Sequence, residues 1–228
     1  MQKDDVFITC PEVTLPCGIV VPSFKVGKYL ASREDGQIVV NGGKPWVMHS
    51  YDEARSAYEA AGYKLITETQ WLALAWDISQ QDCNWTKGKV GKGKIFRGLH
   101  KDTVTCAQSA DFVSPKNSER RTLTLSNGEE IFDLAGNVWE WVFDDVQGDH
   151  DGIVAARVTN ASPSLSTAPY PSLKKGMGWR PEHSWGGCAM IRGGRWNVGA
   201  SSGVFALSLY GARSYVGTNI GSRPAFAI

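Results

Sequence analysis

The string FDLAGNVWEWV at residues 132–142 constrains the fold of this chain more than any other part of the sequence. Gly136 and Asn137 are residue types that readily adopt positive φ, so they predict a tight turn. After the turn, side chains alternate between the two sides of a strand, which places the rings of Trp139 and Trp141 on one side. We therefore expect a strand that two tryptophans anchor in a core beneath long loops.

The composition agrees with a fold that is built mainly from loops. The 228 residues include 25 Gly and 9 Trp. Many glycines indicate tight turns and close backbone approaches, and many tryptophans supply large rigid plates that hold loops in place. This length suffices for one sizeable core, so we expect residues 1–228 to form a single domain.

The charge balance excludes one large class of partners. The chain has 24 Lys and Arg residues against 23 Asp and Glu residues, a net charge of +1. Unspecific binding to nucleic acid requires a basic excess, so we expect no nucleic-acid partner. No apolar stretch approaches the ~20 residues of a membrane helix, and the first ten residues do not read as a signal peptide. We therefore expect no insertion into a membrane.

The cysteines predict no metal centre. The chain contains an odd number of them: Cys10, Cys17, Cys83, Cys106 and Cys188. A pairing of Cys10 with Cys17 stays open, and free thiols in a reducing compartment are the favoured interpretation. Because no C-x-x-C pair occurs, a structural zinc site is not expected.

Secondary-structure signals are brief except at two places. Residues 6–40 are typical of strands interrupted by prolines. Capping boxes that begin at Ser50 and Thr67 predict two helices. The stretch 144–187 is long and irregular, and a loop of that length inside a domain is commonly functional; we expect it to flank the C-terminal region. The pattern favours an α+β domain dominated by loops.

Three apparent chemical motifs fail on inspection. Residues 88–95 approach the phosphate-loop pattern, but Ile95 replaces the magnesium-binding hydroxyl and no strand-to-helix context surrounds them. The four aspartates between residues 144 and 151 do not have the spacing of a calcium loop. The four histidines are scattered without metal-ligand spacing.

Four ordered motifs resemble the formylglycine-generating-enzyme (sulfatase-modifying-factor) branch of the C-type lectin fold. They are PWV with SYDEA at residues 45–54, GYKLITETQW at residues 62–71, the string at residues 132–142, and IRGGRW at residues 191–196. The resemblance runs from about Phe24 to the C-terminus. It implies a compact α+β domain with two helices, twisted antiparallel sheets and long loops.

The resemblance to an enzyme ends at the C-terminal segment. Formylglycine enzymes use two cysteines placed after the R-G-G motif, and residues 196–228 contain none. Without thiolates, copper chemistry of that kind has no ligands. The family's closing G-F-R is replaced here by Gly221-Ser222-Arg223. We therefore expect a protein that is not an enzyme. The alternative is a metal- or oxygen-dependent enzyme of this fold, although the H-x-x-x-H-x-E pattern of the iron-dependent relatives does not occur.

The tail also resembles the variable region of diversity-generating-retroelement proteins. The pieces that carry this resemblance are GGRWNVGA at residues 193–200, GVFAL at residues 203–207 and TNIGSRPA at residues 218–225. In those proteins a reverse transcriptase randomises template adenines, mostly at Asn codons. The resemblance implies a ligand-binding region at residues 191–228. The three framing pieces named above would hold its backbone in place while the residues between them vary.

Two groups of residues follow from this interpretation. The candidate variable positions, which would contact the ligand, are Asn197, Val198, Ser201, Ser202, Ser208, Tyr210, Gly211, Arg213, Tyr215, Val216 and Gly217. Strand alternation predicts that Leu209 points into the core while Ser208 and Tyr210 point outward. The expected scaffold residues are Trp71, Asn137, Trp139, Trp141, Arg192, Gly193, Gly194 and Trp196.

The sequence therefore predicts a ligand- or receptor-binding protein with a diversified C-terminal surface. Its partner would be a protein or glycan on a host or neighbouring cell, and the resemblance favours a phage tail or a bacterial surface as its location. No cofactor is expected, although a structural calcium at carbonyls near Asn137 stays open. A static structural protein of a virion or cell surface is the remaining alternative.

Overall fold

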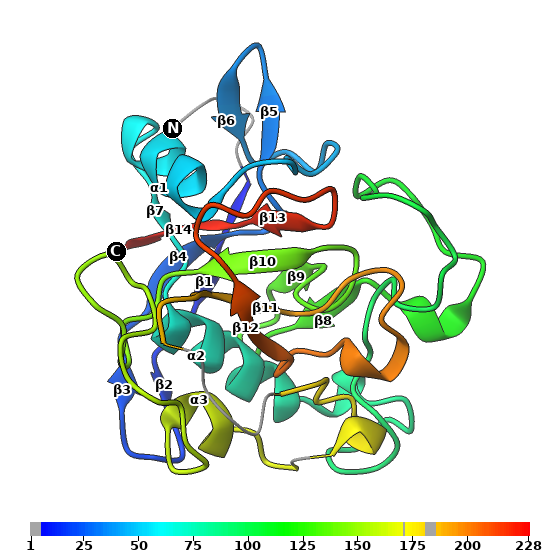
Figure 1. Ribbon diagram of the computed structural model, residues 1–228. Coiled ribbons are helices and arrows are strands. Elements are labelled where there is room, and N and C mark those ends of the chain that lie inside the picture. The colour runs from blue at the N-terminus through cyan, green and yellow to red at the C-terminus, as the bar shows by residue number, and fades with distance from the viewer. Residues whose placement is uncertain (1–5, 171, 181–185) are drawn as a thin grey trace.

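The computed structural model describes residues 6–170, 172–180 and 186–228 and arranges them as two main sheets, two longer helices and extended loops (Figure 1). His183 and part of the 144–187 stretch lie outside the described residues. Within the described ranges, no helix has the length and apolar character that crossing a membrane requires.

The first sheet joins the two ends of the chain. Its strands lie in the order β1-β4-β14-β7, and all neighbours are antiparallel. The four strands are β1 (Phe7–Cys10), β4 (Phe24–Gly27), β7 (Lys64–Leu65) and β14 (Pro224–Ala227). Because β14 lies between β4 and β7, the last residues of the chain are held by strands from its first third.

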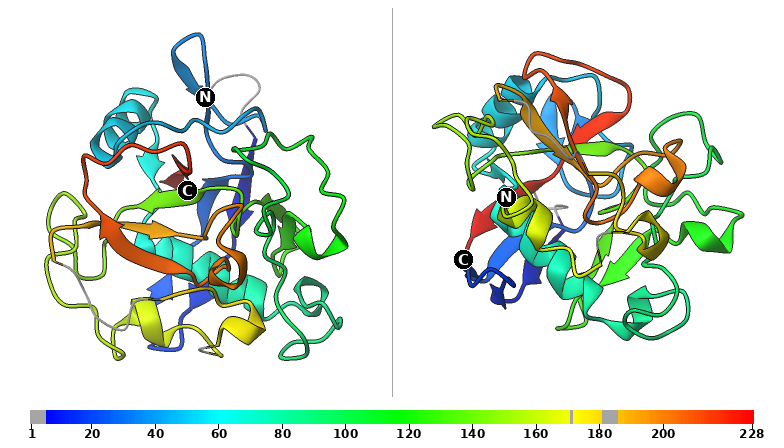
Figure 2. Two further views of the ribbon diagram at one scale, coloured as in Figure 1. Left: turned by 45° about the vertical axis from the view of Figure 1, so that its right-hand side comes forward. Right: turned by 60° about the horizontal axis from the view of Figure 1, so that its bottom comes forward.

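The second sheet carries the tryptophan string and the tail. Its order is β12-β11-β10-β13, in which β10 and β13 are parallel and the other pairs antiparallel. The strands are β10 (Trp139–Val142), β11 (Ala189–Arg192), β12 (Leu207–Gly211) and β13 (Ile220–Ser222). Figure 2 shows this sheet from two further sides, with the orange and red tail segments along it.

Short hairpins and turns complete the chain. Three two-stranded sheets are formed by β2 (Val13–Thr14) with β3 (Val20–Val21), β5 (Ser32–Glu34) with β6 (Gln37–Val39), and β8 (Thr122–Thr124) with β9 (Glu130–Phe132). The 3₁₀ turns are η1 (Asp82–Asn84), η2 (Asn117–Glu119), η3 (Leu173–Lys175) and η4 (Gly199–Ser201).

Both predicted helices form, with both predicted capping boxes. In α1 (Tyr51–Ala60) and α2 (Glu68–Ser79), the side chains of Ser50 and Thr67 accept hydrogen bonds from the backbone N–H three residues on, and the side chain at that position returns one. Almost all of α2 is buried, so it is a core helix rather than a surface one. A third helix that the sequence did not predict, α3 (Pro163–Ser166), is a single turn inside the 144–187 stretch.

The cysteines are unpaired in this structure. Cys10 is buried in the core whereas Cys17 is exposed. Burial raises the pKa of the Cys10 thiol to about 12, so this thiol stays protonated at neutral pH.

Three arginine–carboxylate pairs lie inside the molecule. Arg192 pairs with Glu68, Arg223 with Glu140, and Arg121 with Asp133. The first two pairs are fully buried. Arg223 Nε lies 3.0 Å from Glu140 Oε2, and its two outer nitrogens donate to the carbonyls of Gly27 (2.8 Å) and Phe132 (2.7 Å). Because Arg223 stands between β13 and β14, this group of bonds joins the two main sheets.

Removal of the Arg223 guanidinium tests this connection between the two sheets. Arg223→Met would leave the Glu140 carboxylate buried without a counter-ion, which costs about 3–5 kcal/mol of unfolding free energy. Urea unfolding followed by circular dichroism measures it. The same change at the exposed Arg33 serves as the control and should cost less than about 1 kcal/mol. A loss of under about 1 kcal/mol in Arg223→Met would contradict the assignment.

Candidate functional site

A shallow depression of about 240 Å³ lies on the C-terminal part of the second sheet. The buried side chains of Trp139, Ile191 and Ile220 form its base. Arg195, Tyr210, Tyr215 and Asn219 surround this base. The rings of Tyr210 and Tyr215 are 66% and 47% exposed, which is unusual for large aromatic side chains. The depression therefore has an exposed aromatic rim.

Three of the candidate variable residues, Tyr210, Gly211 and Tyr215, line this depression. Seven of the eleven candidates are exposed or half-buried: Asn197, Val198, Ser201, Tyr210, Arg213, Tyr215 and Val216. They lie on η4 and directly before it, on the outer face of β12 and on the loop between β12 and β13. Tyr, Ser, Asn and Arg are side chains that suit a recognition surface.

Four candidate variable residues are buried, which corrects the expectation that they face a ligand. Ser202 is fully buried, and its hydroxyl donates to the Gly193 carbonyl at 3.1 Å. Gly217 is also buried. Gly211 packs on Trp141, where an added Cβ would lie 3.0 Å from the indole ring. Ser202 and Gly211 thus belong to the support of the surface.

Ser208 is the fourth buried position. Alternation along β12 correctly predicts that Leu209 is buried and Tyr210 exposed, but Ser208 is only 7% exposed. Trp179 borders this face, because its ring stacks on Tyr210 at 5.8 Å and its carbonyl accepts a bond from Leu207 N–H at 2.8 Å. A period of two along one strand cannot reveal a neighbour supplied by a distant loop.

The 144–187 stretch flanks the same surface. Its residues Val154, Val158 and Leu165 form an apolar cluster with Leu207 and Leu209 on the inner side of β12. Trp179 N–H also donates to the Ser201 carbonyl at 2.9 Å. Through these contacts the stretch fills the space beneath β12 and borders the exposed positions.

The predicted turn lies directly beneath the site. Gly136 and Asn137 both have positive φ, at 79° and 61°. The Asn137 carbonyl, at which the sequence left calcium open, accepts a bond from Trp196 N–H at 3.1 Å. The Asn137 side chain bonds both the N–H and the carbonyl of Gln108, each at 2.9 Å. Among the described residues, no group of three His, Cys, Asp or Glu side chains is arranged to hold a metal ion.

The remaining scaffold residues hold the framing pieces. Trp71 Nε1 donates to the Val204 carbonyl at 2.8 Å. Gly193 and Gly194 have φ of 90° and 89°, and a Cβ on Gly194 would come within 2.6 Å of the Ser202 Cα. A side chain at Gly194 is therefore excluded both by its conformation and by its neighbour.

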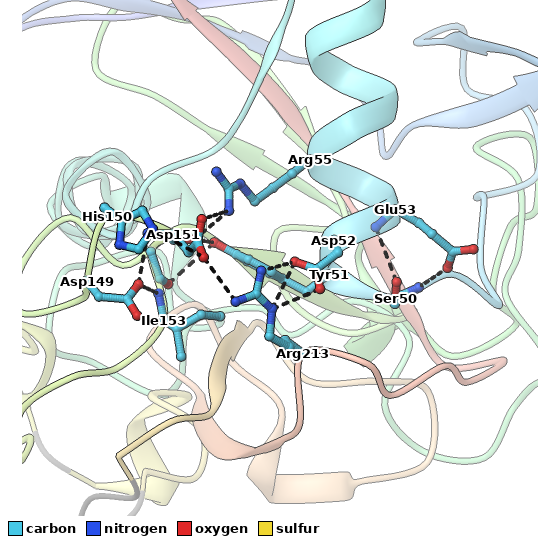
Figure 3. A network of polar contacts seen from close by, with 11 residues as sticks. Ser50, Tyr51, Asp52, Glu53, Arg55, Asp149, His150, Asp151, Ile153 and Arg213 are labelled. Carbon is cyan, nitrogen blue, oxygen red and sulfur yellow. Dashed lines mark hydrogen bonds and ion pairs between the residues drawn. The ribbon is translucent and has the colours of Figure 1, made fainter.

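Arg213 connects the loop between β12 and β13 to α1 and to the 144–187 stretch (Figure 3). Its Nε lies 2.8 Å from Asp52 Oδ2, and its Nη1 lies 3.1 Å from Asp151 Oδ2. Arg55 Nη1 donates to the other Asp151 oxygen at 3.0 Å. The hydrogen bonds from Arg55 and Arg213 hold the pKa of the Asp151 carboxyl below its ordinary value. This exposed network restrains the loop without burying it.

The other aspartates of the acidic stretch also have structural roles. Asp149 Oδ1 accepts from the N–H of Asp151 and Ile153. Asp145 bonds Thr69 at the start of α2, and Asp144 Oδ1 accepts from two following N–H groups. These contacts agree with an acidic loop that is shaped by its own backbone. Residues 88–95 form turns with no helix after them, so the phosphate-loop pattern has no structural counterpart.

A buried histidine lies near the loop between β12 and β13. His49 is stacked on Trp46 at 3.8 Å, and its Nε2 is 3.1 Å from Ser222 Oγ. Its neighbour Met48 donates its N–H to the Gly217 carbonyl at 3.0 Å. Burial lowers the pKa of His49 from 6.5 to about 4. The imidazole is therefore neutral at physiological pH.

Comparison with known proteins establishes the family. The chain belongs to the family described as the sulfatase-modifying factor enzyme 1-like domain, whose model matches residues 23–225. No curated protein matches the chain as a relative.

Solved structures establish the fold. Treponema denticola variable protein 1 is similar with a TM-score of 0.54 and 12% identity, over 98% of this chain and 92% of that one. The α+β C-type lectin fold expected from the sequence is thereby confirmed.

Two further structures are similar at lower scores. The Major Tropism Determinant U1 variant has a TM-score of 0.48 and 15% identity, over 90% of this chain and 50% of that one. PvdO from Pseudomonas aeruginosa has a TM-score of 0.47 and 17% identity, over 98% of this chain and 92% of that one. The chain thus spans half the length of the Major Tropism Determinant.

Paired substitutions on β12 test which positions belong to the support. Gly211→Val forces a side chain against the Trp141 ring, and overpacking of this kind costs about 1–3 kcal/mol of unfolding free energy. Tyr210→Val, one residue away and exposed, should stay within about 1 kcal/mol of the parent protein. Urea titrations measure the unfolding free energy of both variants. Equal losses of unfolding free energy would contradict the assignment of Gly211 to the support and of Tyr210 to the exposed surface.

The buried His49 predicts an acid-sensitive fold. The unfolded chain takes up a proton near pH 6.5 and the folded protein only near pH 4, so stability falls as the pH drops through this window. The loss attributable to His49 is about 3 kcal/mol. His49→Phe keeps an aromatic ring against Trp46 and removes the titration. Unfolding free energies at pH 7 and pH 4 should therefore differ less in the variant, and an unchanged difference would rule out His49 as the cause.

Proposed function

We propose that this member of the sulfatase-modifying factor enzyme 1-like family is a ligand-binding protein without catalytic activity, whose C-terminal surface is diversified by a retroelement reverse transcriptase. One observation carries the proposal. Seven candidate variable side chains are exposed or half-buried, two of them (Tyr210 and Tyr215) line one aromatic depression, and the framing piece at residues 203–207 is buried.

Apart from the ion pairs of Arg213, the contacts that support the backbone of the surface come from residues outside the variable positions. Arg192 at one end of the region is paired with Glu68, and Arg223 at the other end with Glu140. Between them, Val204 is held by Trp71 and Trp196 by Asn137. Side chains at exposed positions can therefore change while the backbone keeps its course. A surface that is already ordered loses less conformational entropy on binding.

The composition of the C-terminal segment opposes the oxygen-dependent alternative. Residues 196–228 contain no cysteine, so no thiolate pair of this segment can hold copper. Stoichiometric iron or copper in the purified protein, together with turnover, would replace the binding proposal by an enzymatic one.

The proposed partner is a protein or glycan on a cell surface. We place the single domain at residues 1–228, the flanking stretch at residues 144–187 and the variable region at residues 191–228. Within that region, the contact surface consists of the seven exposed positions, with Ser202, Ser208, Gly211 and Gly217 as support. The proposal covers this domain alone.

Two matched libraries test the proposal. Randomising Asn197, Val198, Ser201, Tyr210, Arg213, Tyr215 and Val216 should leave most variants folded and should yield binders to unrelated target proteins by phage display. Randomising only Ser202, Ser208 and Gly211 should instead give mainly unfolded variants, because these side chains are buried. Thermal unfolding of random members from each library measures the difference. The binding proposal fails if the first library folds no better than the second or gives no binders.

The coding DNA tests diversification separately. The exposed positions should use codons that arise from AAC by replacement of adenine, and a near-identical template repeat and a reverse-transcriptase gene should lie nearby. Absence of the repeat would remove the diversification claim and favour a static surface protein, while the library results would still stand.

A further inference from the structure

The depression contains two polar atoms that no described residue satisfies. Arg195 Nε and Asn219 Oδ1 are buried, and neither has a hydrogen-bond partner among the described residues. No described carboxylate forms an ion pair with Arg195. Buried polar atoms in folded proteins are nearly always paired, so an unpaired donor and an unpaired acceptor in the same depression indicate a missing partner.

Both residues are fixed by the scaffold rather than by the variable loop. Arg195 lies between Gly194, with φ of 89°, and Trp196, whose N–H donates to the Asn137 carbonyl. The backbone carbonyl of Asn219 accepts from Trp139 N–H at 2.9 Å, directly before β13 begins. Neither residue is a candidate variable position, whereas Tyr210 and Tyr215 beside them are. The depression thus combines a constant polar pair with a variable aromatic rim.

Tyr215 lies beside the Asn219 amide oxygen. A Cβ built on Gly217 would lie 2.8 Å from Asn219 Oδ1 and 2.9 Å from the Tyr215 ring and hydroxyl, so the ring and the amide oxygen approach the same spot. Because the Tyr215 ring is 47% exposed, it can rotate away and open the amide oxygen to a ligand.

We propose that Arg195 and Asn219 bind a main-chain amide of a protein ligand, with the guanidinium donating to its carbonyl and Asn219 Oδ1 accepting from its N–H. The inference deepens the proposed function and rests on it. If Tyr210 and Tyr215 change from one variant of the protein to the next, the ligand changes as well. The unchanged pair can then bind only a group that all these ligands share, and for protein ligands this is the peptide group. Tyr210 and Tyr215 would contact the side chains next to that peptide group.

Other ligand chemistries fit the pair less well. A carboxylate would bind the guanidinium but would bring a second acceptor against Asn219 Oδ1. An N-acetyl sugar carries one amide, but its ring and hydroxyls differ from glycan to glycan and give the constant pair no group common to all of them. The depression of about 240 Å³ has room for one amide with an adjoining side chain.

Titration of the ¹⁵N-labelled full-length chain with N-acetylglycine N-methylamide tests the proposal by NMR. This probe should shift the Arg195 Nε–H resonance in a saturable way in the millimolar range. The resonance is assigned by its loss in Arg195→Lys. Asn219→Leu should weaken binding about fivefold or more, read at the same Arg195 resonance. Arg33→Lys, a matched change at an exposed site outside the depression, should leave the titration unchanged. Amide spectra of each variant confirm that it is folded.

Sodium acetate and N-acetylglucosamine form the comparison arms. If acetate shifts the Arg195 resonance as strongly as the capped glycine, the pair is an anion site and the proposal is wrong. If N-acetylglucosamine binds more tightly, a glycan ligand replaces the peptide. No shift with any probe also overturns it. None of these results affects the two-library test, which does not alter Arg195 or Asn219, so failure here is distinguishable from failure of the proposed function.

Discussion

The buried pair between Arg223 and Glu140 is the interaction on which the rest of the structure depends. Arg223 stands where the chain leaves the second sheet for the first, and its guanidinium also binds the carbonyls of Gly27 and Phe132. A charge in the protein interior is stable only when it is paired and hydrogen-bonded. The requirement for this pairing therefore fixes where the tail ends, independently of the residues that precede it.

A second buried pair does the same at the start of the tail. Arg192 is held by Glu68 at the beginning of α2, and its outer nitrogens also bond the carbonyls of Phe205 and Ser164. The region between the two arginines is thus anchored at both ends by buried ion pairs. These two anchors do not involve its exposed side chains, so a change of such a side chain leaves both anchors in place. Arg195 and Asn219 lie next to backbone that the scaffold holds, at Trp196 and just before β13, whereas the rings of Tyr210 and Tyr215 are exposed.

Local signals in the sequence predicted much of the fold. Both helices begin at capping boxes because the side chains involved are neighbours along the chain. The Gly136-Asn137 turn has positive φ as expected, and Trp139 and Trp141 are buried. The prediction failed where distant segments meet. Ser208 is buried although it was expected to point outward, and the ion pair of Arg213 with Asp52, 161 positions earlier, was not predicted. No local pattern contains these contacts.

The sequence by itself determined the kind of fold and the frame of the site. Short-range capping, turn chemistry and strand alternation act between near neighbours, so ordered motifs suffice to specify them. Only the tertiary structure decided which tail residues reach the surface. Burial depends on what packs from elsewhere: the Trp141 ring closes the space at Gly211, and the 144–187 stretch covers the edge of β12. The Arg195 Nε and Asn219 Oδ1 atoms, which have no hydrogen-bond partner among the described residues, were likewise invisible in the sequence, since a missing partner is recognised only after the neighbouring side chains have been placed.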